Sequence, residues 1–349
     1  MNYLKYGVGT DISKDSFDAC ISAIDSQQIT KVIATHKFAN NPKGFAEYLA
    51  WVKKKTPLEI PIVFVMEATG VYYEQLAWFL FEQECSVAVL LPNKAKKYKE
   101  SLGLKSKNDK IDAKGLSRMI CEQHIKLWKP LSANAYKMRL VTRQIERVSG
   151  LITAMRAQLM GLQHGMHRDK EIELMISKQI SMLQKQKDKL EKRIEDIVEQ
   201  DPVIKKKFEN ILQIKGLGLQ SLAVVIAETN AFTLFENQAQ LVSYAGYDII
   251  ESQSGKHEGK TKLSKKGNTH IRRILHFPAL NVVKFQQTPF KQMYERIYER
   301  NKIKMKAYTA IQKKLLILIY TLWKKDEAFD PNYISEMLKP EPSFALSQA

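Results

Sequence analysis

The stretch IPIVFVMEA, residues 60–68, decides the fold of the first third of this chain. It is a continuous run of β-branched and aromatic residues, without the polar alternation of a strand that has one face in water. Such a run is typical of a strand buried on both faces of a sheet. It ends in an acid, Glu67, and a carboxylate after five apolar residues is costly to bury unless another group pairs with it. The run therefore predicts a central strand with a paired carboxylate at its end.

Upstream of this strand, polar turns separate shorter β-rich runs, which together predict an antiparallel meander. These runs are YGVGTDIS (6–13), FDACISAI (17–24) and KVIATHKF (31–38). Between the meander and the central strand, PKGFAEYLAWVKKK (42–55) has apolar residues at positions i, i+4 and i+7, which is the spacing of one helical face.

Downstream, the pattern alternates between helix and strand. YYEQLAWFLFEQE (72–84) predicts a helix, CSVAVLLP (85–92) a strand, and residues 108–122 a further helix. The resulting order β-β-β-α-β-α-β-α resembles the ribonuclease H-like arrangement, a mixed five-strand sheet with helices around it. We therefore expect an α/β N-terminal domain.

Strand signals vanish beyond residue 130. Between residues 134 and 200, Ile176, Leu183, Leu190 and Ile197 recur every seven residues, which predicts a long helical hairpin or coiled coil. This apolar stripe needs a partner, so we expect self-association through it; the alternative is packing within one chain. The remainder is predicted to be mainly helical. The expected domains are 1–128, a helical oligomerisation region at 129–201, a C-terminal domain at 202–338 and a tail at 339–349.

The charge balance favours a polyanionic partner. The chain has 55 Lys and Arg against 37 Asp and Glu, a formal net charge of +18, which favours nucleic acid. A membrane surface is disfavoured because the excess is spread over several segments, and the longest apolar run near the C-terminus, residues 315–323, is too short to span a bilayer. Three widely spaced cysteines fit neither a disulfide framework nor a zinc pattern. Since no signal peptide is evident, we expect a cytoplasmic, nucleoid-associated protein.

Four carboxylates in the first domain are placed as a two-metal nuclease site requires. Asp11 ends the first strand, and Glu67 ends the central one. Asp109 and Asp112 are spaced i, i+3, which directs both carboxylates from one face of a helix. Oxygen ligands at these points could hold two Mg²⁺ ions on a phosphate. Each acid alone could equally be a helix cap or a surface charge; their combined positions favour the metal site.

The strings GTDISK, MEATGVY and KNDKIDAKGLSR resemble the Asp-Glu-Asp-Asp signature of the DEDD insertion-sequence transposases, a family that includes Piv-like invertases and bridge-RNA-guided recombinases. The resemblance implies that Asp11, Glu67, Asp109 and Asp112 are a RuvC-like metal-binding tetrad. It also implies a second domain with a catalytic serine and a structured guide RNA as partner.

The C-terminal third contains a match to that second domain. LVSYAGYDIIESQSGKHEGKTKLSKKGNTHIRRIL (241–275) resembles the family block in which a Ser-Gly pair precedes a basic segment. Ser254, which directly precedes glycine, is the candidate nucleophile, and Ser252 is its rival. Activation of the hydroxyl would require a base or a metal ion. Without the acidic domain upstream, this segment would be interpreted as a flexible polar loop.

Further residues are candidates for nucleic-acid contact. Gly216 and Gly218 lie in a sequence that resembles a helix-hairpin-helix, where glycines let backbone N–H groups meet a phosphate, although a simple turn between packed helices is equally compatible. Two basic windows, 93–110 and 256–273, are suited to phosphate contact. The candidates there are Lys94, Lys96, Lys97, Lys105, Lys107, Lys256, Lys262, Lys265, Lys266, Arg272 and Arg273.

These features together predict a DNA transposase or site-specific recombinase that uses Mg²⁺ and acts as a homo-oligomer on donor and target DNA. A Holliday-junction nuclease that activates water, leaving Ser254 idle, is the first alternative. A non-catalytic nucleic-acid-binding protein, in which the acids are structural, is the second.

Overall fold

The computed structural model describes most of the chain. It covers residues 3–57, 59–68, 70–103, 109–251, 253–254, 257–259, 261–286 and 288–330. Lys105, Lys107, Ser252, Lys256 and the expected tail lie outside the described residues. The chain divides into two compact units, Met1–Pro130 and Leu131–Ala349.

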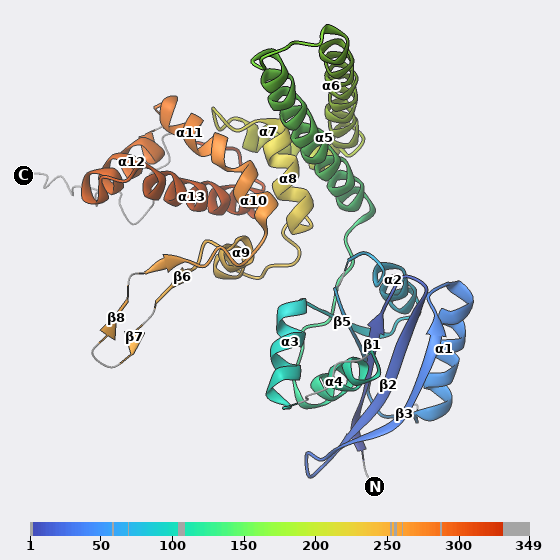
Figure 1. The fold of residues 1–349 in the computed structure, drawn as a ribbon. Helices are drawn as coiled ribbons and strands as arrows, with labels where there is room; N and C mark the ends of the chain where they lie inside the picture. Colours follow the sequence, from blue (N-terminus) through green and yellow to red (C-terminus); the bar gives the residue numbers. More distant parts are fainter. Residues whose placement is uncertain are drawn as a thin grey trace, which may run out of the picture. The chain divides into compact units, whose positions relative to one another are not determined.

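The first unit is a five-stranded sheet with helices on both faces (Figure 1). Its elements are β1 (Tyr3–Ile12), β2 (Ser16–Asp25), β3 (Thr30–Ala39), α1 (Pro42–Lys55), β4 (Ile62–Glu67), α2 (Glu74–Glu82), β5 (Ser86–Leu90), α3 (Pro92–Ser101) and α4 (Asp109–Glu122). The predicted order is confirmed, and α3 is an additional helix within the basic window that begins at residue 93.

The sheet has the strand order β3-β2-β1-β4-β5. β1, β2 and β3 form the expected antiparallel meander, while β4 pairs in parallel with β1 and with β5. β4 is thus a central strand, as its continuous apolar run predicts. This is the ribonuclease H-like arrangement, and the expected fold class is confirmed.

Side-chain alternation assigns each face of the sheet to its own pair of helices. Phe64 and Met66 of β4 pack in one core with side chains of α1 and α2. Val65 lies in a second core with side chains of α3 and α4. Consequently Glu67, two residues after Val65, belongs to the face that α3 and α4 cover.

The second unit is mainly helical, as expected, and Figure 1 shows it from green to red. Its helices are α5 (Ala133–Gln163), α6 (Lys170–Glu199), α7 (Pro202–Leu212), α8 (Leu219–Thr229), α9 (Gln238–Ala245), α10 (Thr269–Ile274), α11 (His276–Lys284), α12 (Thr288–Asn301) and α13 (Lys304–Lys325). Among the described residues, no helix combines the length and the apolar character needed to cross a membrane.

The long helices α5 and α6 form an antiparallel hairpin, and the seven-residue stripe of α6 lies in its seam. Ile176 and Leu183 are buried, and Leu183 packs in one cluster with Val148 and Ile152 of α5. The apolar partner that this stripe requires is therefore present within the same chain. The stripe supplies no argument for self-association.

A short β-ribbon interrupts the helices between α9 and α10. β6 (Ile249–Ile250) pairs antiparallel with β9 (Lys262–Leu263), and β7 (Gln253–Ser254) pairs antiparallel with β8 (His257–Glu258). In Figure 1 these strands form an arm that projects from α9. The sequence contains no strand signal here because pairs of two residues are too short to show an alternating pattern.

Candidate active site

Gly7, Gly9 and Asp11 are alternate residues of β1, so they lie on the same face of the sheet. A Cβ atom on Gly9 would lie 2.2 Å from the carbonyl oxygen of Ala113, and one on Gly7 would lie 2.5 Å from that of Ser117. Both glycines therefore allow the backbone of α4 to approach β1 more closely than any side chain would permit. This close approach brings the first turn of α4 next to Asp11.

Glu67 lies beside Asp11 on the neighbouring strand. Thr10 of β1 is paired with Met66 of β4 in parallel register, so Asp11 and Glu67 each follow this pair by one residue. Both side chains belong to the face covered by α3 and α4, and both are half-buried. The two carboxylates end adjacent strands on the same side of the sheet.

The first turn of α4 contributes the other two acids. Asp109 begins the helix and is exposed, whereas the Asp112 side chain is only 14% exposed. Carboxylates in the first turn interact favourably with the positive end of the helix dipole. This favourable interaction offsets part of the cost of holding Asp112 close to other acids.

The charges of this cluster act on one another. Burial is the first cause that raises the pKa of Asp11 to about 6, and the second is the negative charge of Asp112, Asp109 and Glu67 close by. The ammonium of Lys99, in contrast, lowers the pKa of Asp11. We conclude that Glu67, Asp109 and Asp112 all lie within electrostatic reach of Asp11.

Lys99, on α3, is part of this site although the sequence did not single it out. Its Nζ atom lies 2.9 Å from Oδ1 of Asp112 and 3.6 Å from Oε2 of Glu67. Burial would lower the pKa of Lys99, but the hydrogen bond to Asp112 and the nearby carboxylates raise the pKa above its usual value. A positive charge therefore already lies among the acids.

The donor set suits a divalent cation, because Mg²⁺ prefers carboxylate oxygens and the repulsion among the four acids would be relieved by positive charge. In the ranges that the structure describes, however, no three His, Cys, Asp or Glu side chains are already arranged as metal ligands. Glu67, Asp112 and Asp11 could hold such an ion after a rearrangement of Lys99.

The other candidate residues lie in the second unit, each in a defined place. The backbone of Ser254 is in β7, opposite His257 of β8, so the candidate nucleophile belongs to the β-ribbon. Lys262 belongs to β9 of the same ribbon and is exposed. The next basic residues, Lys265 and Lys266, follow that strand and are also exposed.

The loop that carries Lys265 and Lys266 is fixed to the C-terminal end of α9. Its Asn268 N–H donates to the Tyr244 carbonyl at 2.7 Å, and the Lys265 N–H donates to the Gly246 carbonyl at 3.2 Å. A Cβ on Gly267 would lie only 2.4 Å from the Tyr244 carbonyl oxygen. The two lysines are therefore presented by a tightly held loop.

The two arginines of α10 are less available for nucleic acid than the lysines. Arg272 donates to the carbonyls of Ala245 and Asn268, at 2.7 and 3.3 Å. Arg273 is exposed but pairs with Glu146 of α5. Arg272 thus connects α10 to the end of α9.

The two glycines before α8 differ in their surroundings. Gly216 has a positive φ of 104°, and a Cβ there would lie 2.8 Å from the Cβ of Asn281 in α11. Close packing against α11 accounts for this glycine. Gly218 is the N-cap of α8 and is exposed, with nothing near its missing side chain. Of the two, only Gly218 is open to a phosphate.

Most of helix α3 lies within the first basic window, residues 93–110. Lys94, Lys96 and Lys97 are exposed along this helix, and the Nζ atom of Lys96 lies 3.8 Å from Oε1 of Glu100. These side chains therefore point to solvent on the helix that also delivers Lys99 to the acids.

Sequence reasoning also missed a buried polar network in the second unit. Glu228 is 1% exposed and accepts two hydrogen bonds from Arg143 of α5, at 2.8 and 3.0 Å, and one from Asn268 at 2.7 Å. The signal was available, because Glu228 is an acid within the apolar run of α8, just as Glu67 is in β4.

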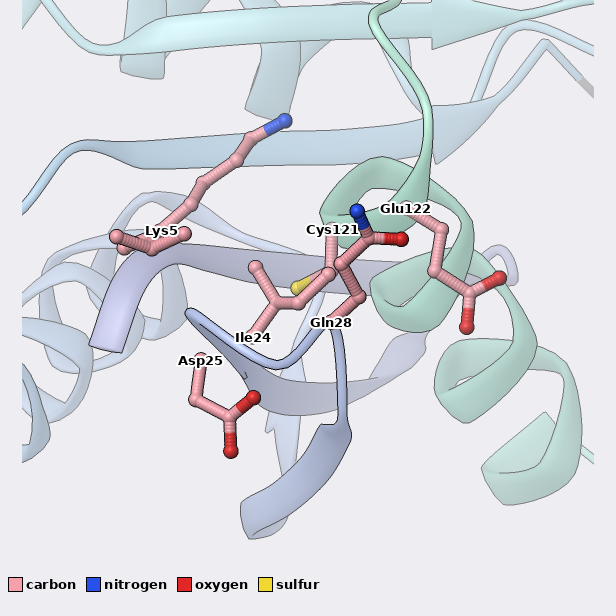
Figure 2. A pocket seen from close by; sticks show the side chains of 7 residues that line it. Lys5, Ile24, Asp25, Gln28, Cys121 and Glu122 are labelled. Atoms are coloured by element: carbon pink, nitrogen blue, oxygen red, sulfur yellow. The ribbon is translucent and has the colours of Figure 1, made fainter. Parts of the chain in front are cut away.

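A pocket of about 520 Å³ in the first unit lies at the other end of β1 from Asp11. Figure 2 shows the residues around it: Lys5 of β1, Asp25 at the end of β2, Gln28 just after β2, and Cys121 and Glu122 at the end of α4. The carboxylate of Glu122 is already engaged by Tyr98 and Arg118. This pocket is not part of the acidic cluster.

Comparisons with known proteins find relatives for most of this chain. A family model described as transposase matches residues 8–167, and the model of the IS116/IS110/IS902 transposase family matches residues 208–295. The pilin gene-inverting proteins of Moraxella bovis and Moraxella lacunata are each 27% identical over 327 residues, covering 93% of this chain and 97% of theirs.

Two solved structures of RuvC from Thermus thermophilus were also found, one of them in complex with a Holliday junction substrate. Both are 12% identical to this chain, with TM-scores of 0.28 and 0.26. They cover 35% and 32% of this chain and 99% and 91% of their own chains.

Both units thus carry a family match, and the two matches together span most of the chain. The first includes all four acids, and the second includes Ser254 and the basic loop. The chain belongs to the IS116/IS110/IS902 family of transposases, enzymes that cut and rejoin DNA.

Proposed function

We propose that this transposase cuts and rejoins DNA with a serine nucleophile, Ser254, and with a Mg²⁺ site formed by Asp11, Glu67, Asp109 and Asp112. The observation that carries the proposal is the convergence of these acids, from two adjacent strand ends and one helix start, on a single cluster. Holding several half-buried carboxylates together costs free energy, and a bound cation would recover it. We propose two ions, because both an attacking and a leaving oxygen need neutralisation.

In this mechanism the Ser254 Oγ attacks a phosphorus atom of the DNA backbone. The Oγ–P bond forms, one backbone P–O bond breaks, the leaving oxygen takes up a proton, and the serine proton passes to solvent. The product is a phosphoserine link, which a DNA hydroxyl reverses when the new strand is joined. Bound Mg²⁺ would supply charge neutralisation and activation of the hydroxyl.

The basic residues support a nucleic-acid role. Lys265 and Lys266 on their fixed loop, Lys262 on the ribbon and the exposed lysines of α3 would contact phosphates. We propose that a structured RNA shares these surfaces with donor and target DNA and selects the sites. The net charge of +18 is suited to two polyanionic partners.

We further propose a homo-oligomer. The inner seam of the α5–α6 hairpin is filled, but Leu151, Met175 and Met182 of these helices are each about half exposed. These residues would be the contact between copies. A division of labour follows, with residues 1–128 binding metal, 129–201 mediating assembly and 202–338 carrying the serine.

The test uses purified protein and junction DNA of its mobile element, with and without the adjacent noncoding RNA. Trapped reactions are separated on a denaturing gel. We expect a DNA-linked protein band that Ser254→Ala abolishes and Ser252→Ala retains. Asp11→Ala should also abolish the band while DNA binding persists.

Other outcomes separate the alternatives. Persistence of the band in Ser254→Ala and its loss in Ser252→Ala would move the nucleophile two residues upstream. Metal-dependent cutting without any adduct in either variant would favour a nuclease that activates water. Equal activity with and without RNA would contradict the proposal that an RNA selects the DNA sites.

A further inference from the structure

Lys99 contacts the acidic cluster directly, and the proposed function gives it no role. Its side chain is 18% exposed, in contrast to the exposed Lys94, Lys96 and Lys97 on the same helix. Its ammonium contacts both Asp112 and Glu67, which come from different elements. The ammonium of Lys99 therefore connects α3 to both α4 and β4.

The aliphatic part of the Lys99 side chain packs against Gly115 of α4. A Cβ atom on Gly115 would lie 2.9 Å from Cγ and 3.3 Å from Cδ of Lys99, so only glycine leaves room for the stem at this position. One residue earlier, Tyr98 donates a hydrogen bond of 2.6 Å to Glu122 at the other end of α4. Helix α3 thus contacts both ends of α4: Tyr98 binds Glu122 at one end, and Lys99 binds Asp112 at the end that carries the acids.

A divalent cation at the acids would require the oxygens that Lys99 now occupies. Asp112 Oδ1 cannot fully serve an ammonium at 2.9 Å and a metal ion at once, and two cations held by the same half-buried carboxylates repel each other. The ammonium and the metal ion therefore compete for one pair of carboxylates.

We infer that Lys99 is an exchangeable counter-ion of the acidic cluster. Its ammonium holds Glu67 and Asp112 together in the metal-free protein and leaves them when a divalent cation binds. This inference rests on the metal site of the proposed function. It makes Lys99 a positioning residue, and it links occupation of the metal site to helix α3 and its exposed lysines.

The experiment measures Mn²⁺ binding to the full chain without nucleic acid, by electron paramagnetic resonance and calorimetry, together with the melting temperature across a Mn²⁺ titration. Lys99→Met removes the charge and keeps an unbranched stem. Lys43→Met, on α1, removes the same charge on the other face of the sheet and is the matched control. Glu67→Gln reports whether Mn²⁺ binds at the acids.

We expect Lys99→Met to bind Mn²⁺ about tenfold more tightly than the parent protein, the order by which neighbours of metal ligands change affinity. Without Mn²⁺ this variant should melt at a lower temperature, because the acids lose their counter-ion. At saturating Mn²⁺ the deficit should disappear. Lys99→Arg should restore the parent affinity, and Lys43→Met should match the parent throughout.

A second variant guards against a folding failure of the first. Gly115→Ala crowds the Lys99 stem without changing any charge, and it should shift Mn²⁺ affinity in the same direction by a smaller factor. An unchanged affinity in both variants, or a melting deficit that persists at every Mn²⁺ concentration, would overturn the inference and leave Lys99 purely structural.

The same data keep the two proposals apart. Tight Mn²⁺ binding by the parent that Glu67→Gln weakens, together with no gain in Lys99→Met, would remove only the role of Lys99. No binding of Mn²⁺ to the parent, to Lys99→Met or to Gly115→Ala would overturn the metal site itself and the inference with it.

Discussion

The side-chain amide of Asn268 donates a hydrogen bond of 2.7 Å to the buried carboxylate of Glu228. Asn268 is also the N-cap of α10, where its Oδ1 accepts from the Ile271 N–H at 3.1 Å. One side chain therefore begins α10, ends the loop of Lys265 and Lys266, and attaches both to α8. The position of the basic loop therefore depends on a buried acid.

Glu228→Gln should destabilise the second unit by roughly 1.5–3 kcal/mol, the range for hydrogen bonds to charged groups. Burial would raise the pKa of Glu228, but the hydrogen bonds from Arg143 and Asn268 outweigh it and lower the pKa. The stabilisation is therefore present above the ordinary glutamate pKa and is lost as the pH falls below it. Urea unfolding at neutral and acidic pH measures this effect, and the exposed Glu209→Gln should change stability by less than about 0.5 kcal/mol.

Gly9→Ala should separate α4 from β1, because the new Cβ would lie 2.2 Å from the Ala113 carbonyl oxygen. We expect a loss of about 1–3 kcal/mol in stability and weaker divalent-cation binding. Gly150→Ala is the control: nothing lies near a Cβ there, and the position is within α5, so the change should stabilise by about 0.5–1 kcal/mol. Unfolding curves that show no cost for Gly9→Ala would contradict the close approach of α4.

Asp11→Asn should stabilise the metal-free protein at neutral pH by roughly 1–2 kcal/mol, taking about 1.4 kcal/mol per pKa unit and discounting for solvent screening. The sign follows from the pKa of about 6, which exceeds the ordinary aspartate value. The folded state binds the proton more tightly, so stability falls as the pH rises from about 4 to about 6. Melting temperatures across this range test it, with Asp15→Asn at an exposed position as the control.

Divalent-cation binding should weaken as the pH drops below about 6, because the ion must then displace a proton from Asp11. Calorimetry in two buffers of different ionisation enthalpy would detect the proton released on binding. A constant affinity between about pH 5 and pH 7.5 would exclude Asp11 as a ligand.

Lys265→Ala and Lys266→Ala should each weaken DNA binding and reduce its salt dependence by about one unit of slope. Arg272→Ala should behave differently, since its guanidinium is held by the Ala245 carbonyl. We expect that variant to lose stability with a smaller change in salt slope. Binding isotherms at several salt concentrations, paired with unfolding curves, distinguish the two classes of residue.

The fold of the first unit could be predicted because β4 is a continuous apolar run and the segments around it show clear strand or helix patterns. The register of β1 and β4 then places Asp11 beside Glu67. Lys99 could not be predicted, since its contact depends on a helix hidden in a lysine-rich window and on the missing side chain of Gly115. The seven-residue stripe of α6 showed that Leu183 needs an apolar partner. Periodicity does not indicate whether that partner is the same chain or another, and here it is α5.

The filled seam of the α5–α6 hairpin also fixes a length. α5 has 31 residues, so the hairpin is about 46 Å long at 1.5 Å per residue. Because the seam between α5 and α6 is filled within one chain, this length does not depend on a second copy. Any group that contacts the tip of the hairpin, residues 164–169, is therefore held away from its base by about one and a third turns of a DNA duplex.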